Sequence, residues 1–102
     1  MYLKIHYSHK STVIAVCDCE LLDKTFKDPN RGITLTTNRN FYEGDLVTLQ
    51  EGLEAVRTAD NVNLVGSRII SAVLDEKLAN EGAVLNIQTE YGNIPHLQIY
   101  HL

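Results

Sequence analysis

Two apolar segments near the start of the chain constrain the fold more than any other feature. Residues 2–8 alternate between apolar and polar side chains, which is the period of a strand with one buried face. Only His9, Lys10 and Ser11 separate this segment from residues 12–17, a β-branched and almost entirely apolar run. Such a run is typical of a strand buried on both faces. The short break therefore predicts a hairpin whose second strand lies inside a sheet.

Two helical patterns follow in the middle of the chain. Thr48 and Glu51 fit a capping box, in which each side chain bonds a free backbone N–H of the first turn. This pattern predicts a helix that ends near Thr58. A second apolar stripe predicts another helix, which begins near residues 61–63 and ends near Leu78. The stripe consists of Val62, Val65, Ile69, Ala72 and Val73.

The other segments predict short strands and loops. Asp18 is a suitable N-cap for a helical turn that ends at Leu22. Pro95 cannot donate a hydrogen bond to a neighbouring strand, so the last strand is expected to begin there or to lie at a sheet edge. The predicted strands are residues 33–36, 84–89 and 94–101, and the clearest loop is residues 27–32.

This order of elements predicts the fold class. Strand pairs before and after two consecutive helices are typical of an α+β fold. A chain of 102 residues is close to the commonest domain size. We therefore predict a single domain, residues 1–102, in which two consecutive helices pack on one face of a mainly antiparallel sheet.

The charge distribution restricts the partners. Residues 1–42 carry six basic and four acidic side chains, whereas residues 43–102 carry three basic and nine acidic ones. A net charge of −4 excludes a strongly basic nucleic-acid-binding domain, so we expect no strong direct binding of nucleic acid. A local contact through the basic residues of the first half stays open, beside the alternative that they are solvated loop charges. They are Lys24, Lys27, Arg31 and Arg39.

The sequence also indicates a compartment. The first residues do not form the apolar core of a signal peptide, and no apolar run approaches the roughly 18 residues that span a bilayer. Cys17 and Cys19 are too close in sequence for an unstrained disulfide and are expected to be reduced. We expect a cytoplasmic protein without membrane contact.

Three polar segments lie at the ends of apolar runs: Cys17–Phe26, Asn63–Gly66 and Gly92–Gln98. In combination they resemble a small archaeal family of unknown function. The resemblance covers nearly the whole chain, and it implies an archaeal cytosolic protein without supplying an established reaction. Asp23 departs from the pattern, which usually has glycine there, and Cys19 falls at a usually charged position. The matching residues are Cys17-Asp18, Glu20-Leu21-Leu22, Lys24-Thr25-Phe26, Phe41-Tyr42 with Gly44, Asn63 to Gly66, and Pro95-His96 with Gln98.

Cys17, Asp18 and His96 are the candidates for catalysis. A helical turn after Cys17 would lower the pKa of its thiol, and His96 would then act as the base. The alternatives are a buried apolar role for Cys17 and a capping role for Asp18. Cys17 and Cys19 with two histidines have poor spacing for zinc, whose paired cysteines usually stand two to four residues apart. We expect neither a metal nor a cofactor.

Five residues are candidates for binding: Lys24, Asn63, Gly66, His96 and Gln98. Lys24 suits an anionic ligand, or it lies along a neighbouring aromatic ring. Asn63 would cap the second helix and leave backbone N–H groups near Gly66 for an anion. His96 and Gln98 share one face of the last strand, and the proline before them restrains the backbone.

These observations leave three hypotheses of function. The leading one is a non-catalytic interaction module, whose His96 and Gln98 face and Cys17–Phe26 segment bind a protein partner in the translation or RNA-processing machinery. The rival is a small enzyme that uses the three catalytic candidates on an anionic substrate held at residues 63–66. Direct RNA binding through the basic first half is the third. A homodimer through an edge strand at residues 94–101 stays open.

Overall fold

The structure, a computed structural model, describes residues 1–100 and contains eight strands, three helices and two 3₁₀ turns. The strands are β1 (Tyr2–Tyr7), β2 (Thr12–Cys17), β3 (Thr25–Asp28), β4 (Ile33–Thr36), β5 (Asp45–Leu46), β6 (Asn61–Val65), β7 (Leu85–Thr89) and β8 (Gly92–Tyr100). The helices are α1 (Arg39–Tyr42), α2 (Leu49–Thr58) and α3 (Ser67–Asp75), and the 3₁₀ turns are η1 (Cys19–Leu21) and η2 (Glu81–Ala83). No helix in this part of the chain is long and apolar enough to span a membrane.

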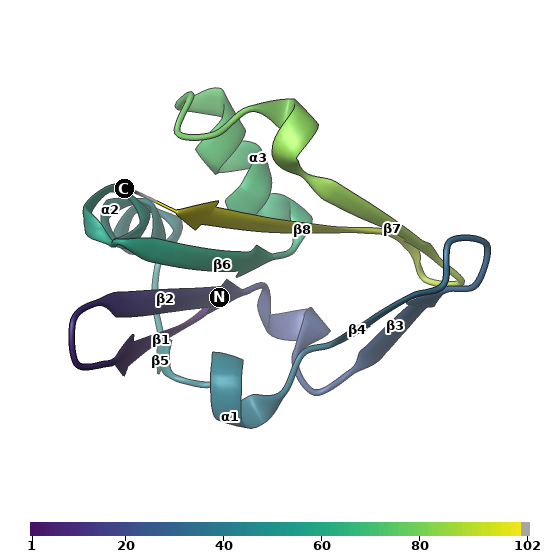
Figure 1. Cartoon of the computed structure of the whole chain (residues 1–102), viewed down its shortest axis with the longest axis horizontal. Coiled ribbons are helices and arrows are strands. Elements are labelled where there is room, and N and C mark those ends of the chain that lie inside the picture. The colour runs from purple at the N-terminus through teal and green to yellow at the C-terminus, as the bar shows by residue number, and fades with distance from the viewer. Residues whose placement is uncertain (101–102) are drawn as a thin grey trace.

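Six strands form the central sheet, in the order β5-β1-β2-β6-β8-β7. All neighbouring pairs are antiparallel except β2 and β6, which are parallel. A second sheet consists of β3 and β4 alone. Figure 1 shows α3 on one side of the central sheet, and α1 with the β3–β4 hairpin on the other. The predicted α+β class with a mainly antiparallel sheet is confirmed.

The predicted N-terminal hairpin is also confirmed. β1 pairs with β2 from Tyr2 opposite Cys17 to Tyr7 opposite Thr12. On its other side β2 pairs with β6, so both edges of β2 are occupied. This inner position is what its continuous apolar sequence predicts.

Helices α2 and α3 cover one face of the central sheet, which we call the first face. The capping box of α2 is confirmed, because the Glu51 N–H donates to Thr48 Oγ1 at 3.2 Å and the Thr48 N–H donates to Glu51 Oε1 at 2.9 Å. One apolar core joins the helices to the sheet. Its buried members are Leu3, Ile14, Val16, Leu53, Val56, Ala59, Val62, Leu64, Ile69, Ile70, Val73 and Leu97.

The start of the predicted second helix is wrong. Residues Asn61–Val65 form β6, and α3 begins at Ser67 and ends at Asp75. The apolar spacing fits a helix, but Gly66 has a φ of 119°, which is not helical, and the strand ends and the helix begins on either side of it. The two helices are therefore not consecutive, because a strand lies between them. Their common position on the first face is as predicted.

The second face of the sheet is covered by η1, α1 and the β3–β4 hairpin. Part of the predicted loop at residues 27–32 belongs to β3, so the connection between the two strands is shorter than expected. Phe26 on β3 is 1% exposed and anchors the hairpin to the sheet. The buried residues of this second core are Ala15, Cys17, Phe26, Tyr42, Val65, Ile87 and Ile94.

Two charged side chains fasten the hairpin to β7, the edge strand of the central sheet. Asp28 Oδ2 accepts a hydrogen bond from the Gln88 N–H at 3.1 Å and pairs with Arg31 at 2.9 Å. Arg31 also donates to the carbonyl oxygen of Asn86. The Gln88 N–H is the largest cause of the lowered pKa of Asp28. These contacts occupy backbone groups through which an edge strand would otherwise pair with another chain.

The predicted position of Pro95 is wrong. β8 lies between β6 and β7, and the Pro95 carbonyl oxygen accepts a hydrogen bond from the Gly66 N–H at 3.0 Å. The N–H and C=O of a residue in an antiparallel ladder point to the same side. The missing N–H of Pro95 therefore faces the end of β6, and no bond to β7 is lost. β7 pairs with β8 only as far as His96, so the homodimer alternative stays a prediction for the residues beyond it. The predicted last residue, 101, lies outside the described residues.

Candidate functional site

The carboxyl group of Asp18 lies at the N-terminus of α3. Asp18 follows β2 and Gly66 follows β6, so the parallel pairing of these strands brings the two residues together. Asp18 Oδ2 accepts a hydrogen bond from the Arg68 N–H at 3.0 Å, the bond that an N-cap side chain normally makes. The N-cap residue itself is Gly66, which has no side chain. Asp18 occupies the N-cap position of η1, as predicted, but its side chain makes no cap bond there and caps α3 instead.

The close contact between Asp18 and Gly66 also explains why residue 66 is a glycine. A Cβ at residue 66 would lie 2.3 Å from the Asp18 carboxyl group, and a φ of 119° is disfavoured for other residues. The anion site predicted at residues 63–66 would use backbone N–H groups near Gly66, but the Gly66 N–H donates to the Pro95 carbonyl oxygen and the Arg68 N–H donates to Asp18. The predicted cap Asn63 lies within β6.

Asp18 is an unusual buried acid. It is 2% exposed, and its Oδ1 has no hydrogen-bond partner among the described residues. Burial raises the pKa of Asp18, and the hydrogen bond from the Arg68 N–H opposes this only in part. These properties fit a structural cap.

Cys17 is buried in the second core. Its side chain is fully buried, and its thiol donates to the carbonyl oxygen of Asp18 at 3.3 Å. Burial, followed by the charge of Asp18, raises the pKa of the Cys17 thiol to about 12. Because the thiolate is the nucleophilic form, the environment of Cys17 opposes the chemistry of the rival hypothesis.

The three catalytic candidates do not converge. Cys17 and His96 are both opposite Val65, one from each neighbouring strand, so two strand spacings of about 4.8 Å separate them. Asp18 follows Cys17, and its carboxyl group lies at the start of α3, on the first face. Cys17 and His96 lie on the second face. The geometry does not favour an enzyme that uses these groups together.

A chain of hydrogen bonds does connect three side chains on the second face. The Tyr42 hydroxyl donates to Asn63 Oδ1 at 2.6 Å, and His96 Nε2 lies 3.1 Å from the same oxygen. Since Asn63 Oδ1 accepts, His96 donates through Nε2 and keeps Nδ1 as an acceptor. Burial lowers the pKa of His96, which favours the neutral ring.

Asn63 and His96 belong to a larger surface, which we call the polar strip. It consists of Asn61 and Asn63 on β6 and of His96, Gln98 and Tyr100 on β8. Gln98 is directly opposite Asn63, and Tyr100 is opposite Asn61. Gln98 is exposed, and Tyr100 is 67% exposed. The strip is thus partly ordered by internal hydrogen bonds and ends in an exposed aromatic ring.

The other candidates lie apart from this chain. Lys24 is exposed on the connection between η1 and β3, where its N–H donates to Thr37 Oγ1 and its carbonyl oxygen accepts from the Thr37 N–H. Cys19 is exposed at the start of η1. Among residues 1–100, no group of three His, Cys, Asp or Glu side chains is placed to hold a metal ion.

The sequence analysis missed the roles of Tyr42 and Tyr100. The ring of Tyr42 is buried in the second core, and its hydroxyl reaches Asn63 on β6. Tyr42 and Asn63 are 21 residues apart in the sequence, so no local pattern indicates their hydrogen bond. The alternation of Asn61 and Asn63 with apolar residues was a usable signal for β6, and hence for the strip.

The fold and the site define a small α+β protein whose sheet has a helix layer on one face and a hairpin layer with a polar strip on the other. Residues 6–102 match the family described as "Protein of unknown function (DUF424)", and the chain belongs to this family. The resemblance to a family of unknown function is thereby confirmed.

One solved structure is similar over nearly the full length. It is the crystal structure of an uncharacterized conserved protein from Methanopyrus kandleri, which is 31% identical with a TM-score of 0.73. The match covers 99% of this chain and 90% of that one. No curated protein matches the chain.

The two cysteines are expected to differ sharply in reactivity. In the native protein at mildly alkaline pH, a thiol reagent should modify the exposed Cys19 and leave Cys17 intact, because Cys17 is buried and its pKa is raised. Denaturant should then release a second reactive thiol. The variant Cys19→Ser is the control and should show no rapidly modified thiol. Rapid modification of Cys17 in the folded variant would contradict its structural role.

The pH dependence of stability should report His96. A histidine whose pKa is lowered by folding stabilises the protein above its usual pKa of 6.5, and this contribution is lost as the pH falls from 6.5 through the folded value. We expect the free energy of unfolding, measured with urea, to fall over this range more in the native protein than in His96→Gln. Parallel curves for the two proteins would contradict the assignment.

Proposed function

We propose that this protein is a non-catalytic interaction module and that the polar strip binds a protein partner. The observation that supports it is the chain of hydrogen bonds from Tyr42 through Asn63 to His96, beside the exposed ring of Tyr100. These bonds order the polar groups before a partner arrives. Ordered side chains lose less conformational entropy on binding than free ones.

The chemistry of the strip suits a protein surface. Tyrosine is among the residues that contribute most to protein interfaces, and Tyr100 offers an apolar ring with a polar end. Gln98 and the neutral His96 offer hydrogen bonds without a charge that binding would have to desolvate. A partner segment with both backbone polar groups and an apolar side chain would fit this combination.

The identity of the partner is also part of the proposal. We propose a protein of the translation or RNA-processing machinery, in keeping with the small archaeal cytosolic family that the sequence resembles. We place the protein in the cytoplasm, where such a partner is found.

Partner binding should depend on the exposed end of the strip. We expect Gln98→Ala and Tyr100→Ala to retain the fold, because both side chains are exposed, and Tyr100→Ala to weaken partner capture at least about fivefold. The measurement is capture by the tagged protein from the lysate of its source organism, with and without ribonuclease, read by mass spectrometry.

Matched controls are available on other surfaces. Gln50 is exposed on α2 and Tyr7 is 78% exposed at the end of β1, so Gln50→Ala and Tyr7→Ala should bind normally. Undiminished capture by folded Gln98→Ala and Tyr100→Ala would contradict the proposal. Loss of every partner on ribonuclease treatment would contradict a direct protein partner.

A further inference from the structure

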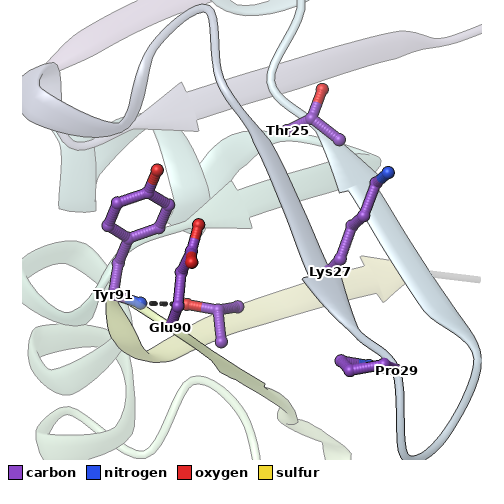
Figure 2. Close-up of a pocket in the computed structure, with 6 residues that line it drawn as sticks. Thr25, Lys27, Pro29, Glu90 and Tyr91 are labelled. Carbon is purple, nitrogen blue, oxygen red and sulfur yellow. Dashed lines mark hydrogen bonds between the residues drawn. The ribbon is translucent and has the colours of Figure 1, made fainter.

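A cleft separates the β3–β4 hairpin from the turn between β7 and β8, away from the residues of the polar strip. Its volume is about 600 Å³, which is within the range of small-molecule sites. Figure 2 shows Glu90 and Tyr91 on one side of the cleft and Thr25, Lys27 and Pro29 on the other.

Tyr91 presents an ordered aromatic surface in this cleft. Its ring is 70% exposed, yet it makes an edge contact with the buried ring of Phe26, with 6.4 Å between the centroids and an interplanar angle of 88°. The turn is also fixed, because the Tyr91 N–H donates to Thr89 Oγ1 at 3.0 Å, the dashed line in Figure 2. That hydroxyl in turn donates to the Gly92 carbonyl oxygen at 2.9 Å. A large exposed ring in a fixed position is suited to stacking with a planar ligand.

The opposite side of the cleft carries positive charge in an acidic protein. Residues 24–36 contain three basic and one acidic side chain, whereas the whole chain has a net charge of −4. Lys27 lines the cleft, and no ion pair among the described residues involves it. Its ammonium group is thus available to an anion. Arg31 of the same hairpin is instead paired with Asp28.

We propose that this cleft binds a nucleoside phosphate, with the base stacked on Tyr91 and the phosphate at the ammonium group of Lys27. Glu90 supplies an acceptor for the amino or hydroxyl groups of the ligand, and Pro29 supplies an apolar wall. The ligand is either a free nucleotide or one nucleotide of a single-stranded RNA, since both present a base and a phosphate. This site does not depend on the polar strip.

The test is a titration of the isotope-labelled full chain, followed by its amide chemical shifts in NMR. The probes are adenosine monophosphate, uridine monophosphate, inorganic phosphate alone and a short oligouridylate. We expect saturable shifts at Thr25, Lys27, Glu90 and Tyr91 with the nucleotides. Tighter binding of the oligouridylate assigns the site to a strand, and equal binding assigns it to a free nucleotide.

Substitutions of Tyr91 and Lys27 test the stacking of the base and the binding of the phosphate separately. Tyr91→Ala should weaken nucleotide binding at least about fivefold, whereas Tyr91→Phe should bind normally, because stacking needs only the ring. Lys27→Ala should lower the slope of the logarithm of oligouridylate affinity against the logarithm of salt concentration by about 0.7. Tyr7→Ala and Lys10→Ala, at exposed positions around the β1–β2 turn, are matched controls.

Three results would overturn the proposal. One is the absence of saturable shifts at the cleft with any nucleotide. Another is binding of inorganic phosphate as tight as that of the nucleotides, since stacking would then contribute nothing. The third is an equal loss of affinity in Tyr91→Ala and Tyr7→Ala.

Discussion

The contact between Asp18 and Gly66 organises both layers of this protein. At this point the Asp18 N–H donates to the Val65 carbonyl oxygen at 3.1 Å, and the Gly66 N–H donates to the Pro95 carbonyl oxygen at 3.0 Å. Three neighbouring strands are thereby held together where the chain turns into α3. The Asp18 carboxyl group caps this helix on the first face, while the preceding Cys17 is buried in the core of the second face. A dipeptide thus joins the two cores.

The two buried acids of the protein show how environment decides the effect of a carboxyl group. Asp18 and Asp28 are each 2% exposed, but the pKa of Asp18 is raised by burial and that of Asp28 is lowered by its hydrogen bonds. Asp28 has the Gln88 N–H and Arg31 as donors, whereas one oxygen of Asp18 has no partner among the described residues. Two interactions offset the desolvation of the Asp18 carboxyl group. The cap bond to α3 typically contributes about 1 kcal/mol to stability, and a negative charge is favoured at the positive end of the helix.

The sequence predicts the elements that local patterns specify. The first hairpin, the capping box at Thr48 and the α+β class follow from periodicity and short-range hydrogen bonding. The strand β6 was missed because its apolar residues also fit the stripe of the helix that follows. Gly66, with its positive φ and its contact with Asp18, separates the two. The site is harder to predict, since the pairing of β6 with both β2 and β8 brings Asp18 to α3 and His96 to Asn63. Local sequence patterns do not predict which strands pair over such a distance in the chain.

The most direct test of the central contact is the free energy of unfolding of Gly66→Ala and Gly82→Ala, measured with urea. Gly82 has open space around its Cβ position and no positive φ, so its substitution should change stability by no more than about 0.5 kcal/mol. Gly66→Ala should lose about 2 kcal/mol or more, from the unfavourable φ and the clash with the Asp18 carboxyl group. Equal stability of the two variants would contradict the role of the Asp18–Gly66 contact.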